Sequence, residues 1–276
     1  MRLSQALHTA ARHYCQRQSS YWDQYSNKLS QTKPRPSNYQ QVLLDGYARS
    51  NVLRVICIAI EQLNPDELND LEQTRDCISQ IGRVAQEPRL RPNMGQTTEP
   101  EVSLLDFGVC SDDAISHERE AFCNYVEELS ESHLKSIEPL PYQRVLSPAE
   151  SSNIWHQLRD RWRVVGPYWY PLSNRRLPGI AAFDADAFEE FCTSFSLIDL
   201  LASREITRIL ELREYGIEYE QDVSLFDPVY SNYEGYWVSD GFDWIIYASH
   251  ECSVTLGGWL LKEVKAQWQD WEQHAW

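Results

Sequence analysis

The residues best suited to chemistry lie near the C-terminus, where Ser249, His250 and Glu251 follow one another. A hydroxyl, an imidazole and a carboxylate are the groups that a hydrolase uses as nucleophile, general base and orienting acid. Adjacent residues of an extended segment point to opposite faces, so these three cannot form a triad by themselves. Two interpretations remain: a hydrolase that uses His250 with Glu251 or another nearby carboxylate, or a β-turn whose Ser and His side chains bond local backbone.

A second set of candidate groups consists of the carboxylates Glu211, Glu214, Glu218 and Glu220. Two of them could perform glycosidase-like acid and base catalysis if they faced each other at about 5–10 Å. Alternation of acids along exposed strands is more typical of a solvated face. The sequence contains no Gly-rich phosphate loop and no nucleophile elbow to accompany them. This favours a binding surface over catalysis.

Charge and aromatic residues are both concentrated in the second half. The segment 184–251 holds 16 Asp and Glu against three Arg, and nine of the ten Trp follow residue 150. The net charge of −16 argues against general binding to nucleic acid or to an anionic membrane, because both require cations. Acids beside aromatics instead indicate recognition of a basic protein, with aromatic anchors and charge complementarity.

The seven cysteines are odd in number and widely spaced, and no Cys-x-x-Cys pair occurs. A disulfide framework and a structural zinc site are therefore not expected, and neither is a cofactor. No second His stands at ligand spacing from His250, so we expect no metal there. The N-terminal segment lacks an apolar signal core, and these features together predict a cytoplasmic protein.

Hydrophobic spacing predicts two regions with a boundary in the Pro-rich segment Glu138-Pro139-Leu140-Pro141. The first, residues 1–137, is a helical region, with helices over about 3–29, 42–60, 64–85 and 113–133 and a linker at 87–112. Asn64-Pro65-Asp66-Glu67 has the cap and proline that are typical of a helix start. Arg2 and His8 have the spacing of the Arg–His pair in HEPN-type helical ribonucleases, a match short enough to arise by chance.

The second region, residues 138–276, mixes strands with helices. Ser147-Pro148-Ala149-Glu150 is a capping box that begins a helix through Trp162. Strands are expected near 164–172, 180–183, 206–212, 217–219 and 254–256, with helices at 186–195 and 260–271. Asp240-Gly241 between two apolar runs predicts a β-hairpin. The fold class is α+β: a helical N-terminal region followed by a domain with an antiparallel sheet and packed helices.

The block from Asp243 to Glu251, continued by Gly257-Gly258 and a Trp-rich end helix, resembles the closing segment of bacterial immunity proteins. These are the SUKH-like and related families, which neutralise polymorphic toxins. The resemblance covers at most residues 148–276, and the helical first half departs from it. It implies an α+β fold that acts by binding, often by covering a basic nuclease active site. It carries over no catalytic residues.

We therefore expect a non-catalytic bacterial defence protein that binds a basic protein partner, such as a toxin. The alternatives are the His250 hydrolase and a structural subunit of a larger assembly. The expected binding residues combine acids and aromatics: Glu211, Glu214, Glu218, Glu220, Asp222, Tyr233, Tyr236, Trp237, Asp240 and Asp243.

Overall fold

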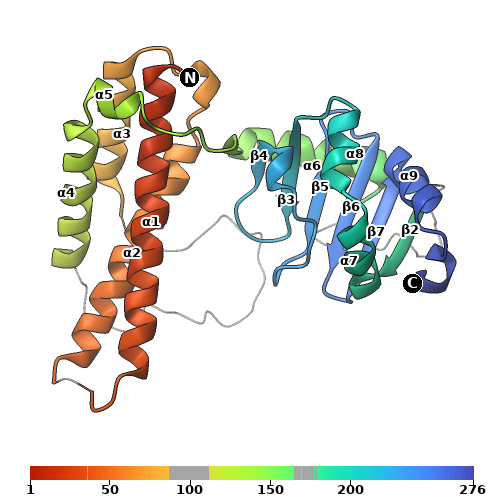
Figure 1. Cartoon of the computed structure of the whole chain (residues 1–276), viewed down its shortest axis with the longest axis horizontal. Coiled ribbons are helices and arrows are strands. Elements are labelled where there is room, and N and C mark those ends of the chain that lie inside the picture. The colour runs from red at the N-terminus through yellow and green to blue at the C-terminus, as the bar shows by residue number, and fades with distance from the viewer. Residues whose placement is uncertain (36, 87–111, 165–168, 170–176, 178) are drawn as a thin grey trace. The chain divides into compact units, whose positions relative to one another are not determined.

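The computed structural model describes residues 1–35, 37–86, 112–164, 169, 177 and 179–276, and it divides the chain into two compact units (Figure 1). The units are Met1–Leu140 and Pro141–Trp276, so the division falls inside the Pro-rich segment, three residues after residue 137. The expected linker at 87–112 and most of the expected strand at 164–172 lie outside the described residues.

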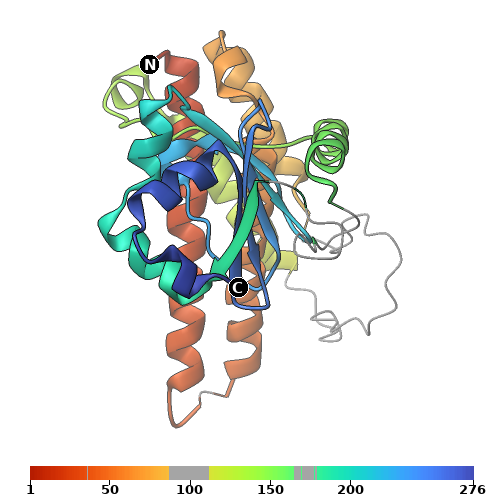
Figure 2. The ribbon, with the colours of Figure 1, turned by 90° about the vertical axis from the view of Figure 1, so that its right-hand side faces the viewer.

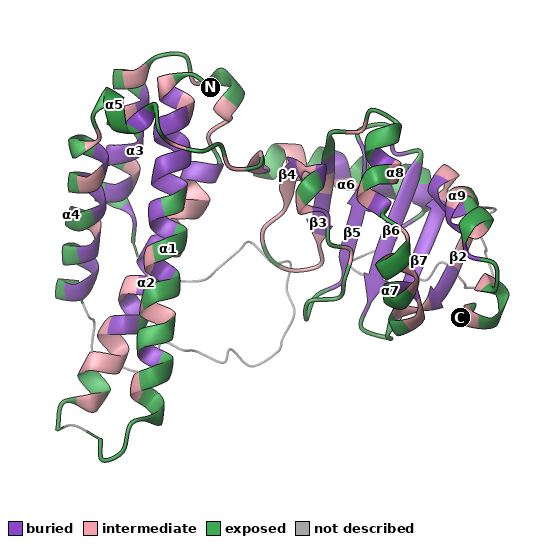
Figure 3. Cartoon of the chain, in the orientation of Figure 1, coloured by how far each residue is buried: buried purple, intermediate pink, exposed green. Residues whose placement is uncertain are grey.

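The first unit is helical. It contains α1 (Leu3–Gln31), α2 (Tyr39–Glu61), α3 (Leu71–Val84), α4 (Asp112–Glu128), α5 (Glu131–Leu134) and a single 3-10 turn, η1 (Pro65–Glu67). One face of each long helix contributes to the core, in which Leu7, Leu53, Ile56 and Phe122 are fully buried. In Figure 3 buried stretches alternate with exposed ones along the helices of this unit, as expected where one face of each helix is buried.

The helix expected from Asn64 begins later than its cap signal indicates. Asn64 does accept a hydrogen bond from the Asp66 backbone N–H at 3.1 Å, but the turn that it caps ends at Glu67. Asp70 then caps α3 by accepting from the Gln73 N–H at 2.7 Å. A side-chain cap satisfies the same free N–H groups whether one turn or four follow, so the signal does not fix the helix length.

The second unit is built on one antiparallel sheet of seven strands, in the order β1-β4-β3-β5-β6-β7-β2. The strands are β1 (Gln143–Val145), β2 (Ile180–Asp184), β3 (Arg208–Arg213), β4 (Tyr219–Asp222), β5 (Gly235–Val238), β6 (Trp244–Ser249) and β7 (Ser253–Gly258). The α+β fold class predicted from the sequence is confirmed. The short edge strand β1 was not predicted.

The helices of this unit cover the two faces of the sheet unequally. The helices α7 (Ala185–Ser194), α8 (Leu197–Ser203) and α9 (Trp259–Gln267) pack on one face, whereas α6 (Pro148–Trp162) packs on the other (Figures 1 and 2). Side chains alternate between the faces, so Trp237 lies among α7, α8 and α9 while Tyr236 lies on the α6 side. The 3-10 turns η2 (Val223–Leu225) and η3 (Trp271–His274) complete the unit.

The hairpin signal at Asp240-Gly241 is confirmed, with a longer connection than a two-residue turn. β5 and β6 are joined by residues 239–243, and the positive φ of 49° falls on Phe242. The Phe242 N–H donates to the Ser239 carbonyl at 3.1 Å.

The last helix also ends earlier than expected, at Gln267, and Trp271 begins the separate turn η3. In the described part of the chain, no helix has the length and apolarity to cross a bilayer.

Candidate functional site

The residues expected to form one acidic surface lie in three places: at the two ends of the sheet and in the interior of the unit. Arg213 at the end of β3 is opposite Gly235 at the start of β5, and Gly235 is opposite Ala248 near the end of β6. The segments 214–218 and 250–252 therefore meet at one end, which we call the Glu234 end, and residues 231–234 join them there through the Arg213–Ser231 and Tyr215–Tyr233 contacts. Asp222, Asp240 and Asp243 lie at the opposite end, because Asp222 pairs with Arg208 and the other two belong to the β5–β6 connection.

Three of the expected binding residues are buried. Tyr236 and Trp237 belong to the core on opposite faces of the sheet, with relative exposures of 0% and 2%. Glu211 is 6% exposed; it accepts from Arg213 Nε at 2.6 Å and from Gln221 Nε2 at 2.8 Å. The expectation that these three side chains form a docking surface is corrected, because a partner cannot touch them in this fold.

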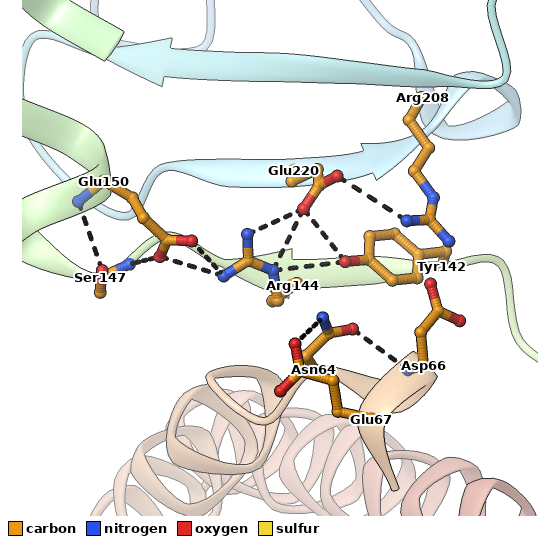
Figure 4. A network of polar contacts seen from close by, with 9 residues as sticks. All are labelled: Asn64, Asp66, Glu67, Tyr142, Arg144, Ser147, Glu150, Arg208 and Glu220. Atoms are coloured by element: carbon orange, nitrogen blue, oxygen red, sulfur yellow. Dashed lines mark hydrogen bonds and ion pairs between the residues drawn. The ribbon is translucent and has the colours of Figure 1, made fainter. Parts of the chain in front are cut away.

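Glu220 and Glu218 are engaged by other side chains of their own unit. The Arg144 guanidinium lies between two carboxylates, with Nη2 at 2.8 Å from Glu220 and Nη1 at 2.9 Å from Glu150 (Figure 4). Arg208 is a second cation near Glu220, at 3.8 Å. Trp155 donates its indole N–H to Glu218. These contacts hold α6 and β1 to β4, so these two acids have a structural role.

The Glu234 end brings a histidine and a carboxylate together. The His250 Nδ1 contacts Glu234 Oε1, which also accepts the backbone N–H of His250 at 3.2 Å. On the other side of the ring, Nε2 lies 3.3 Å from Glu251 Oε1. The hydrogen bond to Glu234 is the main cause that raises the His250 pKa above its ordinary 6.5, and burial opposes it. The residues 250–252 form a turn, with Ser249 Oγ accepting from the Glu251 N–H at 3.1 Å.

Glu234 was not among the site residues predicted from the sequence, although its position relative to β5 indicates which face of the sheet it occupies. It directly precedes β5 and shares the parity of Tyr236, so alternation places both on the α6 face. Its side chain is 1% exposed, whereas the His250 side chain is 53% exposed. The next row inward on this face holds Tyr236 and Tyr247, whose rings stack at 4.7 Å. Burial raises the pKa of both phenols, and a hydrogen bond with Glu234 raises that of Tyr247 further.

An exposed apolar loop leads directly into Glu234 along the chain. Val229, Tyr230 and Tyr233 have relative exposures of 40%, 42% and 45%. They belong to the segment 227–233 that precedes β5, which we call the 227–233 loop. Tyr233 was expected to be a surface anchor and is exposed as expected; its ring lies 6.3 Å from that of Tyr215. Large apolar side chains gathered in one loop are typical of interaction sites.

The Arg–His spacing at the N-terminus does not form an accessible ribonuclease site. His8 is 2% exposed, and its Nε2 lies 3.1 Å from the Ile60 carbonyl between α1 and α2. Burial, aided by the nearby Arg12, lowers the His8 pKa to about 4. Arg12 is itself buried against Glu61, with 3.0 Å between Nε and Oε1. A neutral, enclosed imidazole cannot reach a nucleic-acid substrate, so we interpret His8 as a packing residue.

Within the described ranges, no group of three or more His, Cys, Asp or Glu side chains is arranged to hold a metal ion. Comparison of the chain with protein-family models, with curated proteins and with solved structures gave no match.

Proposed function

We propose that this chain is a non-catalytic binding protein that docks a basic protein partner at the Glu234 end of its sheet. The observation that carries the proposal is the exposure of Val229, Tyr230 and Tyr233 within one five-residue stretch. Tyrosine supplies a large contact area at a low cost in side-chain entropy and is enriched among interface hot spots. The 227–233 loop would thus supply most of the affinity.

The charge around the loop selects the chemistry of the partner. The described segments of this end carry the acids Glu214, Glu218, Glu234 and Glu251. Their cations are Arg213, which pairs with Glu211, and His250, which pairs with Glu234 and Glu251. A net negative rim attracts a cationic surface, speeds its association and disfavours acidic competitors.

The finer class follows from the sequence resemblance to toxin-neutralising immunity proteins. The residues that carry the resemblance, 243–258, form β6, the His250 turn and β7, which border the proposed docking end. We propose that the partner is a basic toxin and that binding takes place in the bacterial cytoplasm. Such a chain would act stoichiometrically, with no turnover.

The test is capture from the source cell followed by reconstitution. The full chain would be immobilised, and a retained basic protein would be purified and titrated against the wild type and Tyr230→Ser. Loss of a hot-spot tyrosine costs about 2 kcal/mol, which weakens the dissociation constant about 30-fold. Association should also slow as salt rises, since screening shortens the field to about 8 Å at physiological ionic strength.

The matched control is Tyr47→Ser, on α2 of the helical unit. Tyr47 is 43% exposed and Tyr230 is 42% exposed, so the two changes remove similar exposed rings. The proposal requires that only Tyr230→Ser weakens binding. Equal affinities for both variants, or an association rate that does not depend on salt, would refute it. A partner that arrests cell growth alone and is silenced by co-expression of this chain would support the immunity class.

A hydrolase remains the second candidate, because the structure places a buried carboxylate on the imidazole. Glu234 orients Nδ1 of His250, and an imidazole oriented in this way can act as a general base. A panel of ester, amide and phosphate substrates would be assayed with the wild type, His250→Ala and Glu234→Gln. An enzyme would lose turnover in both variants while its circular dichroism spectrum is unchanged. A binder would show no turnover in any of the three.

A further inference from the structure

The helices α1 and α2 of the helical unit approach each other closely. A Cβ added at Gly46 of α2 would collide with Ser26 Oγ of α1, so the two backbones lie near each other at that point. Ser19, earlier in α1, accepts from Ser50 Oγ, later in α2, at 3.4 Å, which shows that the two helices are antiparallel. Small side chains at all four positions allow this close contact, so short side chains further along it can also meet.

Two thiols occupy such positions. Cys15 precedes Ser26 by eleven residues in α1, and Cys57 follows Gly46 by eleven residues in α2. Eleven residues make about three helical turns, so both cysteines return to the face that the two helices share. Cys15 is 1% exposed in the helical core, and the partly buried Cys57 packs against that core. The helix pairing therefore places one enclosed thiol beside one that solvent can reach.

The surroundings of the two thiols differ in a way that makes Cys57 the first to react. The Cys57 thiol donates to Glu61 Oε1 at 3.7 Å, and this carboxylate oxygen also accepts from Arg12 Nε. Burial raises the pKa of the Cys15 thiol, and a hydrogen bond between the two thiols raises it further. The reactive form of cysteine is the thiolate, and its reaction requires access. Cys57 has both access and a neighbouring proton acceptor.

We propose that Cys57 and Cys15 form a reversible disulfide when the chain meets a hydroperoxide. The Cys57 sulfur attacks one peroxide oxygen and the O–O bond breaks, which gives a sulfenic acid on Cys57 and, with the thiol proton, water. The Cys15 sulfur then attacks the Cys57 sulfur: the S–S bond forms, the S–O bond breaks, and the hydroxyl leaves with the Cys15 proton as water. The two thiols are oxidised by two electrons, and the peroxide is reduced to two molecules of water.

The disulfide would join α1 to α2 and would make the helical unit sensitive to oxidants. A cross-link restricts the unfolded chain more than the folded one, so the oxidised unit should unfold at a higher temperature than the reduced unit. A dithiol reductant would reverse the change by attacking the accessible Cys57 sulfur. The inference goes beyond the proposed function, because it concerns a modification site in the other unit of the chain.

The experiment treats the folded full chain with hydrogen peroxide and then alkylates it in denaturant. We expect alkylation of two fewer of the seven thiols, and peptide mapping by mass spectrometry should find Cys15 joined to Cys57. Dithiothreitol should restore both thiols. In Cys15→Ala the reaction should stop at the sulfenic acid, which dimedone would trap on Cys57. The wild type should give much less of this adduct, because Cys15 consumes the sulfenic acid.

The control variant is Cys192→Ser, which removes another partly buried thiol, on α7 of the second unit. It should form the cross-link as the wild type does, whereas Cys57→Ser should not form it. Circular dichroism before oxidation would show that each variant is folded. The proposal is overturned if peroxide joins Cys15 to a different cysteine, or if the Cys15–Cys57 link forms only in the unfolded chain. It is also overturned if folded Cys15→Ala gives no dimedone adduct on Cys57.

Discussion

Acidification should destabilise the helical unit through a single histidine. His8 is enclosed between α1 and α2 with Nε2 at 3.1 Å from the Ile60 carbonyl, so the neutral ring donates this proton. In the folded chain its pKa is about 4, against 6.5 for the ordinary group, chiefly because burial disfavours the cation. The unfolded chain therefore binds a proton at a pH where the folded chain does not.

The sign and size of the effect follow from linkage. The stability associated with neutral His8 is complete above pH 6.5 and is lost as the pH falls from 6.5 toward 4. Each pKa unit is worth 1.36 kcal/mol, so this shift corresponds to about 3 kcal/mol. A loss of that size is a large fraction of the free energy of unfolding of an ordinary domain. We expect it to appear in the slowest-exchanging amides of α1 and α2.

The assay is native-state hydrogen exchange of the full chain at pH 7 and pH 4, corrected for the intrinsic exchange rate. His8→Gln keeps an N–H donor for the Ile60 carbonyl but cannot titrate, so it should lose about 3 kcal/mol less than the wild type over this range. His13→Gln, at an exposed position of the same helix, should behave as the wild type. Identical pH dependence in the wild type and His8→Gln would show that His8 is not held neutral by the fold.

Two other predictions concern the sheet. Glu234→Gln should lower the His250 pKa toward 6.5, because it removes the contact that raises that pKa; NMR titration of the ring would show this, and an unchanged pKa would exclude Glu234 as the cause. Gly258→Ala should lower the melting temperature and cost about 3 kcal/mol, since φ is 74° and a Cβ would collide with the Asp243 carbonyl. Gly241→Ala, where a Cβ would meet nothing closer than 3.7 Å, should cost much less.

Local chemistry made much of the fold predictable from the sequence. The Ser147 capping box begins α6 as expected, with Glu150 Oε2 accepting a hydrogen bond from the Ser147 N–H at 2.9 Å. Alternation of apolar residues predicted β3, because side chains on an extended chain must alternate between faces, and the Asp240-Gly241 turn signal predicted the β5–β6 hairpin. The strand β1 and the helix α8 were missed, since three and seven residues are too few to show a period.

The candidate site was less predictable, because its parts converge only through strand pairing. Glu214, Glu234 and His250 are far apart in the chain, and the β3–β5–β6 register brings them together. The sequence did indicate His250 and Glu214. It could not show that the carboxylate beside His250 is Glu234 instead of Glu251 alone, since no local pattern encodes the order of strands in a sheet.

The same pairing explains why a high density of acids along the chain does not make one acidic surface. Consecutive strands run in opposite directions, so acids in successive connections alternate between the two ends of the sheet, as Glu214 and Asp222 do. Five of the ten tryptophans are likewise buried in the core, Trp237 and Trp244 being at most 2% exposed. Affinity for a partner must then come from what the core leaves outside, which at the Glu234 end is tyrosine and not tryptophan. The binding proposal therefore depends on one short loop, which holds Val229, Tyr230 and Tyr233.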